Sequence, residues 1–510
     1  MRKFTRLFVL GAMLTGLLAL SAACGDDDNG GTNTPAASTT AAGSPSPGGD
    51  PTKPGAAGIA SNPRAVQGYA NWKLDDGVAM FSSRPANENR TGVTSSSIKI
   101  CQPISQTGAG AIYSAYLVLM REDINRINAA GGIHGRQIEW VTRDDASNPT
   151  QATQIDKELV ENGGCFMIFG QKGTAIVSGQ TQYMQEQGVP YFMVGASAAT
   201  LGEPGFPNAL TATLSVTFST YAFATQIFSD NPGDKLVIMY QNDDYGKSGL
   251  TGFETAAAKT GGQIVAKIPF DAAAVEISGE LNQAVSSGAD AFVGIGLPPA
   301  WPKFVTGLRQ TLGSQMQIYD PGGLSAQAGD FPNKDTLLNG VVAFNAAAEQ
   351  LSSSNQSVQE VNSILQAAGV QPNQFAITYG QSDIEHLARV LECSGPDLTR
   401  KGFIQVMNYG CLDGSWKCTV CLAPSIVTPD DRWAFESLQY TKYDPAKHGL
   451  VANGAPVIRE TSAGNGIRGN LPGFECSDKL PCPWKNGCTT TDRCAWKGTA
   501  ATPSAWGAAP

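Results

Sequence analysis

From residue 98 onward, short apolar runs alternate with longer stretches in which apolar residues recur every three or four positions. The short runs have the length of buried strands, and the longer stretches have the period of amphipathic helices. Strands are predicted at 98–103, 137–143, 165–169, 191–194, 235–240, 263–269, 291–295, 317–319 and 341–344. Helices are predicted at 109–129, 150–161, 174–186, 218–228, 249–258, 276–286, 301–312, 357–368 and 375–393. This alternation, at intervals of about 20–30 residues, predicts an α/β fold with parallel sheets flanked by helices.

In open sheets of this kind, ligands bind beyond the carboxyl ends of the strands. The candidate functional residues should therefore lie in the loops that lead from a strand into the next helix. These loops begin near Ser105, Gly170, Gly195, Asp243, Gly296 and Asp320.

The amino-terminal pattern is that of an exported protein. Arg2, Lys3 and Arg6 precede an apolar stretch at 7–20, which is followed by small residues up to Cys24. The apolar stretch is too short to span a bilayer comfortably, so residues 1–23 are interpreted as a signal peptide rather than an uncleaved anchor. The residues around Cys24 resemble a bacterial lipobox, with Ser21 where leucine is usual, and an ordinary cleavage site is the alternative. We expect a lipid on Cys24 that holds the protein at the outer face of the membrane, or release into the periplasm without it.

Two segments of different composition follow the signal peptide. Residues 24–63 are rich in Gly, Ser, Thr, Pro, Ala and Asp, and they cannot bury enough apolar surface to offset the entropy of ordering. We expect this segment to be a flexible linker. Residues 64–96 are mixed and form an amino-terminal extension of unassigned role. The roughly 490 residues after the signal peptide exceed one typical core and predict at least two domains.

The charge balance and the cysteine count narrow the function. A net charge of −9, with charged residues at 15% of the chain, argues against nucleic acid as a partner. Setting Cys24 aside leaves ten of the eleven cysteines, a number that could pair completely in an oxidising compartment.

Several short motifs occur in a characteristic order. They read IKI at 98–100, INAAGGIHGR at 127–136, RDD at 143–145 with NP at 148–149, GVP at 188–190 and DYG at 244–246. Their order and spacing resemble type I periplasmic binding proteins, and within them the leucine/isoleucine/valine-binding receptors of ABC transporters. The resemblance covers about residues 95–450.

The resemblance implies two doubly wound lobes joined by three crossovers. The amino-terminal lobe would hold 97–213 and 341–423, and the carboxy-terminal lobe would hold 214–340 and 424–455. A small solute would lie between the lobes and close them, because it contacts both only in the closed state. Residues 456–510 lie beyond the resemblance and form a Cys-rich carboxy-terminal extension.

The resemblance also implies a set of ligand contacts. Thr174 falls where the family has a hydroxyl that meets the ligand's carboxylate, and as the first residue of a predicted helix it lies near N–H groups that suit an anion. Gly195 and Ser197 match a backbone carbonyl and a second hydroxyl. Tyr245 matches a tyrosine that reaches across from the second lobe, and Leu297 stands where a relative has an aromatic wall.

One position departs from the pattern of amino-acid receptors. Where relatives often place a carboxylate against the ligand's ammonium group, this chain has Gly322, and Asp320 would point elsewhere if it ends the strand. An ammonium group that loses its water requires a counter-charge. The ligand is therefore left open between an amino acid, an amide and a small organic acid.

Other candidate residues have structural alternatives. Lys172 could neutralise an acidic ligand or lie in solvent, and Trp301 could stack on a ligand or begin a packed helix. The three histidines have no metal or triad spacing in the sequence, so we expect neither an enzyme, nor a cofactor, nor a metal site.

The cysteines are interpreted mainly as disulfide partners. Cys101 and Cys165 lie on strands that are neighbours in the doubly wound order, and Cys393 and Cys411 flank a helix, which makes two candidate bridges. Zinc or redox chemistry is the alternative for Cys418 and Cys421, but zinc usually takes a second close pair. The remaining cysteines allow three pairings that sequence cannot choose between: Cys476, Cys482, Cys488 and Cys494.

The sequence thus predicts an exported, monomeric solute-binding lipoprotein. It would capture a small molecule and deliver it to the permease of an ABC importer, as in amino-acid transport. A ligand-binding sensor that signals to a membrane partner would share the same motifs and remains the alternative.

Overall fold

The computed structural model describes residues 84–458, with gaps at 109–111, 114–115, 198–205, 325–332, 347, 410, 413–415, 426, 428–431 and 455, together with Phe474–Cys476 and Cys494–Trp496. The expected signal peptide, the lipid site at Cys24 and the linker lie outside the described residues, as do Cys482 and Cys488. No helix among the described residues is both long enough and apolar enough to cross a membrane.

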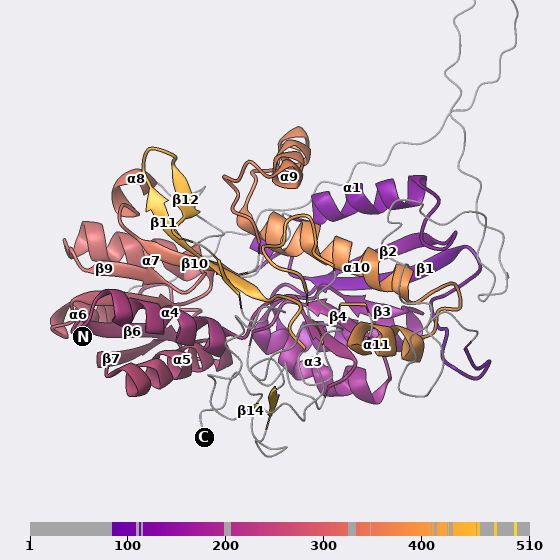
Figure 1. Cartoon of the computed structure of the whole chain (residues 1–510), viewed down its shortest axis with the longest axis horizontal. Helices are drawn as coiled ribbons and strands as arrows, with labels where there is room; N and C mark the ends of the chain where they lie inside the picture. Colours follow the sequence, from indigo (N-terminus) through magenta and orange to yellow (C-terminus); the bar gives the residue numbers. More distant parts are fainter. Residues whose placement is uncertain are drawn as a thin grey trace, which may run out of the picture. The chain divides into compact units, whose positions relative to one another are not determined.

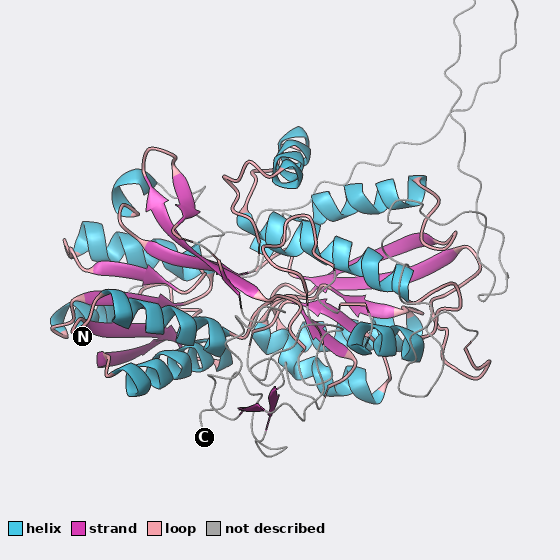
Figure 2. Cartoon of the chain, viewed as in Figure 1, coloured by secondary structure: helices cyan, strands magenta, loops and turns pink. Residues whose placement is uncertain are grey.

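The first half of the fold is built on a parallel five-stranded sheet in the order β2-β1-β3-β4-β5 (Figures 1 and 2). Its strands are β1 (Ser97–Ile104), β2 (Gln137–Asp144), β3 (Met167–Phe169), β4 (Tyr191–Val194) and β5 (Ala209–Thr211). Successive residues of β1 face opposite sides, so that Ile100 enters one core and Cys101 another.

Helices cover both faces of this sheet. α1 (Tyr116–Ala129) and α10 (Ser382–Cys393) lie on one face, and α3 (Thr174–Glu186) lies on the other (Figure 1). α2 (Pro149–Lys157) packs beside α3 on that second face. The remaining helical segments are η2 (Glu158–Asn162), α9 (Gln356–Ala367), η7 (Ala376–Gln381) and α11 (Arg400–Tyr409).

The second half is built on an eight-stranded sheet in the order β12-β11-β10-β9-β8-β6-β7, with β13 paired to β11. Its parallel strands are β6 (Lys235–Gln241), β7 (Gln263–Phe270), β8 (Ala291–Ile295), β9 (Gln317–Asp320) and β10 (Val342–Ala346). The antiparallel strands are β11 (Ser437–Asp444), β12 (Gly449–Ala452) and β13 (Val457–Ile458). The helical segments are α4 (Val216–Asp230), α5 (Asp244–Thr260), α6 (Ser278–Ser286), η4 (Pro298–Ala300), α7 (Trp301–Thr306), η5 (Gly307–Thr311) and α8 (Lys334–Leu337).

The chain passes between the two sheets three times, as expected from the resemblance. It crosses between β5 and α4, between β10 and α9, and before β11. The second crossing differs from the expected boundary at 341: β10 pairs in parallel with β9 through Val342 and Tyr319, so it completes the second sheet before the chain returns. The predicted α/β fold of two doubly wound lobes is confirmed.

Three disulfides join described cysteines. Cys101–Cys165 and Cys393–Cys411 confirm the two bridges expected from sequence. Cys418 pairs with Cys421, which supports the disulfide interpretation over a metal pair. In the carboxy-terminal extension, β14 (Phe474–Cys476) and β15 (Cys494–Trp496) pair antiparallel, with Cys476 opposite Cys494 in register; the pairing of these cysteines stays a prediction.

Candidate functional site

A cavity of about 110 Å³ is lined by residues from both halves of the fold. One side comes from loops and helices of the first sheet, and the other comes from α4, α5 and the loops after β8 and β9. Six of the eight residues predicted as ligand contacts line it together: Thr174, Gly195, Ser197, Tyr245, Leu297 and Gly322. The structure therefore brings together positions that the sequence separates by up to about 150 residues, as expected where the ends of parallel strands meet.

The first half contributes hydroxyl groups to the cavity. Thr174 is the first residue of α3, and the preceding Gly173 has no side chain with which to cap that helix. The first N–H groups of any helix have no acceptor within it, so this end of α3 carries partial positive charge beside the cavity. The hydroxyl of Thr174 accepts a 3.4 Å hydrogen bond from the backbone N–H of Ser197, which fixes these two residues next to each other.

Gly195 is required by the packing of Lys172. A Cβ atom at Gly195 would lie 2.2 Å from Cδ of Lys172, so any larger residue would displace the lysine stem. The backbones of these two residues form a parallel bridge, and the N–H of Gly173 donates to the carbonyl of Gly195. Gly195 thus forms a thin wall between the cavity and the buried lysine.

Lys172 itself does not line the cavity, and neither alternative considered for it describes its position. It is 1% exposed, and its Nζ lies 2.6 Å from Oδ2 of Asp383 and 3.0 Å from the carbonyl oxygen of Met193. Burial lowers the pKa of Lys172 and raises the pKa of Asp383, while the attraction between the two charges opposes both shifts. The ammonium also lies 4.5 Å from the ring centroid of Tyr379, so Lys172 supports the cavity wall from behind.

An aromatic wall completes the first side. The rings of Tyr113 and Phe375 stack with centroids 5.0 Å apart, and Phe375 lies 5.1 Å from Tyr379. All three rings line the cavity, and burial raises the pKa of Tyr113 to about 12. Sequence reasoning missed them because Phe375 and Tyr379 lay inside a predicted helix, where aromatic residues four positions apart more often belong to a core.

The second half contributes a phenol and an apolar surface. Tyr245 lies in the first turn of α5, whose N-cap Asp243 accepts a 3.0 Å hydrogen bond from the N–H of Gly246. Burial and the nearby Asp320 carboxylate raise the pKa of Tyr245 above its usual range, so its phenol stays protonated and able to donate. Leu297 and Phe344 line the same side.

Asp320, at the end of β9, is turned into the protein. It is 0% exposed; its Oδ1 accepts hydrogen bonds from the N–H groups of Gly322 (2.9 Å) and Gly323 (2.7 Å), and its Oδ2 accepts from Leu324 (2.9 Å). The carboxylate therefore holds the turn that carries Gly322 to the cavity, as the sequence reasoning anticipated when it placed Asp320 away from the ligand.

Trp301 lies outside the cavity. Its side chain is 0% exposed and packs edge-on to Phe304, with ring centroids 5.4 Å apart. Trp301 therefore begins a packed helix, as the structural alternative had it, and does not stack on a ligand in the cavity. It still shapes the cavity indirectly, since a Cβ at Gly323 would lie 2.3 Å from its Nε1.

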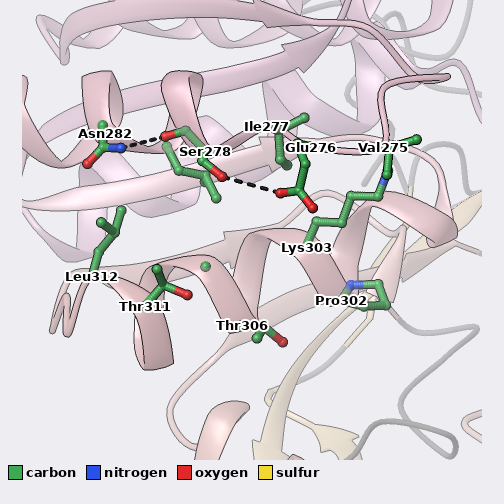
Figure 3. Close-up of a pocket in the computed structure, with 12 residues that line it drawn as sticks. Val275, Glu276, Ile277, Ser278, Asn282, Pro302, Lys303, Thr306, Thr311 and Leu312 are labelled. Atoms are coloured by element: carbon green, nitrogen blue, oxygen red, sulfur yellow. Dashed lines mark hydrogen bonds between the residues drawn. The ribbon is translucent and has the colours of Figure 1, made fainter. Parts of the chain in front are cut away.

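A second hollow, of about 360 Å³, lies between α6 and the α7–η5 segment of the second half (Figure 3). It is lined by residues such as Val275, Glu276, Ser278 and Lys303, and Lys303 donates to the carbonyl of Ala274. No predicted ligand contact lies in it, and all of its lining residues belong to the second half, so the two halves do not meet there.

His386 lies close to a cysteine pair, which the linear spacing did not reveal. A ligand atom of His386 and the sulfurs of Cys418 and Cys421 lie within 4.8 Å of one another, and all three residues are buried. The sulfurs are joined in a disulfide, whereas a metal site needs thiolates. His386 is instead satisfied by contacts with the carbonyl of Ser382 (2.7 Å) and the hydroxyl of Ser425 (2.8 Å).

Comparison with known proteins supports the resemblance drawn from the motifs. Residues 97–417 match the sequence model of a family described as periplasmic binding protein. Leu/Ile/Val-binding protein homolog 8 of Brucella suis biovar 1 (strain 1330) is 29% identical over 218 residues, which are 39% of this chain and 54% of that protein. Homolog 7 of Brucella abortus (strain 2308) is 27% identical over 175 residues, 33% of this chain and 44% of that protein. The chain thus spans about half the length of the relatives it matches, and the expected resemblance is confirmed.

Solved structures share the fold at lower identity. A fatty acid ABC transporter substrate-binding protein from Thermomonospora curvata has a TM-score of 0.64 at 22% identity, over 76% of this chain and 97% of that one. A branched chain amino acid ABC transporter protein from Thermus thermophilus with bound valine has a TM-score of 0.61 at 16% identity, over 71% and 97%. A solute binding protein from R. palustris in complex with 4-hydroxybenzoate has a TM-score of 0.60 at 17% identity, over 70% and 95%.

Proposed function

Because this chain belongs to the periplasmic binding protein family, which consists of solute-binding proteins with an extracytoplasmic location, we propose that it is a receptor that captures a small molecule and delivers it to an ABC importer. The solute would be an amino acid, an amide or a small organic acid. The related structures bind compounds of two of these kinds: valine is an amino acid, and 4-hydroxybenzoate is an organic acid.

One observation carries this proposal: hydroxyl groups from the first half and a protonated phenol from the second half face the same small cavity. Thr174 and Ser197 offer hydroxyls beside a helix N-terminus, and Tyr245 offers its phenol from α5. A solute that bonds to both sides stabilises the arrangement in which the two sides meet, which is how ligand binding shifts a hinge equilibrium.

The rest of the proposal concerns the membrane. We propose that a lipid on Cys24 holds the protein at the outer face of the membrane, that the linker at 24–63 gives the folded body its reach, and that the protein acts as a monomer without catalysis. Mass spectrometry of the protein purified from membranes tests the lipid, since a diacylglyceryl group on Cys24 adds a defined mass to the amino-terminal peptide.

Native mass spectrometry of the purified protein, followed by thermal unfolding with a solute panel, tests the receptor function. A solute at 100 times its Kd stabilises the bound state by about 2.7 kcal/mol. We expect at least one class among amino acids, amides and organic acids to raise the melting temperature. An unmoved melting curve with all of them, and with sugars, would contradict the receptor function.

Two variants test the position of the site. Tyr245→Ala and Ser197→Ala each remove a polar contact from one side of the cavity, and we expect each to weaken the identified solute at least tenfold, or about 1.4 kcal/mol. Unchanged affinity in the double variant would show that the solute binds elsewhere.

A further inference from the structure

The charges around the cavity restrict the solute more than its shape does. None of the described residues that line the cavity is Asp, Glu, Lys, Arg or His. A solute with an ammonium group would lose water on entering and would find no carboxylate on the described walls to replace it.

Two buried carboxylates that lie next to residues of the cavity wall are already engaged. Asp320 accepts hydrogen bonds from three backbone N–H groups and is fully buried. Asp383 is also 0% exposed and pairs with Lys172 behind the ring of Tyr379. Neither carboxylate can turn toward an ammonium group without giving up these partners.

An anion, in contrast, meets favourable groups. Thr174 and Val216 line the cavity and are the first residues of α3 and α4, which have 13 and 15 residues. The amino-terminal ends of both helices carry partial positive charge. The hydroxyls of Thr174 and Ser197, and the protonated phenol of Tyr245, can donate to carboxylate oxygens.

The body of the solute must suit a small apolar space with an aromatic wall. Tyr113, Phe375 and Tyr379 form one wall, and Leu297 and Phe344 also line the cavity. The cavity volume of about 110 Å³ is of the order of the ~150 Å³ cavity that accepts a benzene ring in another protein. A flat ring can stack on this wall with offset or edge contacts.

We propose that the solute is a small aromatic monocarboxylate without an ammonium group. This inference rests on the proposed receptor function and narrows it: the carboxylate meets the helix ends and hydroxyls, and the ring packs on the aromatic wall. It separates this chain from receptors that bind α-amino acids.

Matched pairs of solutes test the inference by calorimetry on the purified protein. 3-Phenylpropanoate and L-phenylalanine differ by the α-ammonium group, as do 4-methylpentanoate and L-leucine, while benzoate and benzamide differ by the negative charge. We expect each ammonium-free acid to bind at least 100-fold more tightly than its amino acid, and benzoate to bind at least tenfold more tightly than benzamide.

The outcomes distinguish this inference from the receptor function. Tighter binding of either amino acid than of its partner acid overturns the inference and leaves the receptor standing. Equal binding of benzoate and benzamide overturns the anionic part. No binding by any of these six solutes also overturns the inference, and the wider thermal-unfolding panel then decides whether the receptor function stands.

A pair of variants adds a gain-of-function test. A Cβ at Gly322 would meet Phe344 atoms at 3.6 Å, an ordinary contact distance, although the φ of +108° strains any side chain at this position. Gly322→Asp places a carboxylate at the cavity, and Gly322→Asn carries the same strain and shape without the charge. We expect L-phenylalanine to bind at least tenfold more tightly to the aspartate variant than to the asparagine variant, and benzoate to bind more weakly. Equal affinities in two folded variants overturn the inference.

Discussion

The two halves of this fold each bury a carboxylate beside the same cavity, and they neutralise it in different ways. In the first half, Asp383 forms an ion pair with Lys172. In the second half, Asp320 is held by backbone N–H groups of the turn that follows β9. In both halves the buried charge stabilises the wall rather than facing the cavity, so the polar character of the site comes from hydroxyls and helix ends.

The difference between the two arrangements concerns what remains when the carboxylate is lost. Without Asp383, the protein retains a buried cation with no counter-ion. Without Asp320, it retains buried but neutral N–H groups. Uncompensated charge is the more costly of the two, so the first half should be more sensitive to substitution.

Asp383→Ala is expected to have the largest effect. It leaves Lys172, which is 1% exposed, without its ion-pair partner, and the free energy of unfolding should fall by about 3–5 kcal/mol. Urea denaturation followed by fluorescence measures the change.

Two controls accompany this variant. The double variant Lys172→Met with Asp383→Leu removes both charges and should regain most of the lost stability. Glu254→Ala breaks the ion pair between Lys267 and Glu254 in the second half, whose side chains are 51% and 43% exposed. This loss should change the free energy of unfolding by under about 1 kcal/mol. If Asp383→Ala behaves like Glu254→Ala, the buried pair does not support the first half.

A pH measurement sharpens the comparison within the first half, where Asp156 of α2 is a third buried carboxylate. It accepts a 3.1 Å hydrogen bond from Gln171, and burial raises its pKa to about 7. A raised folded-state pKa means that the group contributes stability below its unfolded pKa of about 4, and that this contribution is lost as the pH rises through 7. Asp156→Asn keeps an acceptor for Gln171 and does not titrate.

The stability of the wild type relative to Asp156→Asn should therefore fall between pH 5 and pH 7 by on the order of 2–3 kcal/mol. Urea denaturation of both proteins at the two pH values checks this, because every other titrating group is common to both. A difference that stays constant, or that grows in favour of the wild type, would show that Asp156 is already ionised at pH 5.

The sequence predicted most of the strands and helices because apolar periodicity reports burial directly. β4 and α3 have the same bounds as predicted. Strand β5 has only three residues, which is too short for its apolar residues to show a repeating pattern. The boundary between α3 and β4 was predicted correctly from Gly188, whose φ is +59°. The late strands β11 and β12 were not predicted because they form an antiparallel edge, which does not follow the strand–helix repeat of the rest of the chain.

The site was predicted only in part, because some of its residues come together only when distant segments of the chain fold against each other. Thr174 and Tyr245 follow strands, so their places were readable from chain order. The aromatic wall comes from segments near residues 113 and 375, which meet only after folding. The burial of Lys172 could not be predicted either, because its ion-pair partner Asp383 lies 211 residues away in the chain.

Asp320→Ala tests the second half. It removes the acceptor of three backbone N–H groups and should lower the free energy of unfolding by about 2 kcal/mol, less than Asp383→Ala, because these three donors are neutral. Asp271→Ala is a matched control on the same half, since that exposed carboxylate accepts one backbone hydrogen bond of 2.8 Å from Ala273. Its effect should stay within about 0.5 kcal/mol. An Asp320→Ala effect equal to that of Asp383→Ala would erase the distinction between the halves.

Tyr245→Phe has the smallest expected effect and isolates one atom of the second half. The ring remains in place and only the hydroxyl group is removed. In the wild type this hydroxyl stays protonated and is therefore able to donate a hydrogen bond. One lost hydrogen bond to a carboxylate weakens benzoate by about fivefold to tenfold, or about 1–1.4 kcal/mol, with little change in melting temperature without solute. Tyr240→Phe makes the same chemical change on β6, outside the cavity, and should leave affinity unchanged. Because the phenol reaches the cavity from the second half, a full loss of affinity in Tyr245→Phe would mean that this half holds the carboxylate and that the hydroxyls of the first half do not.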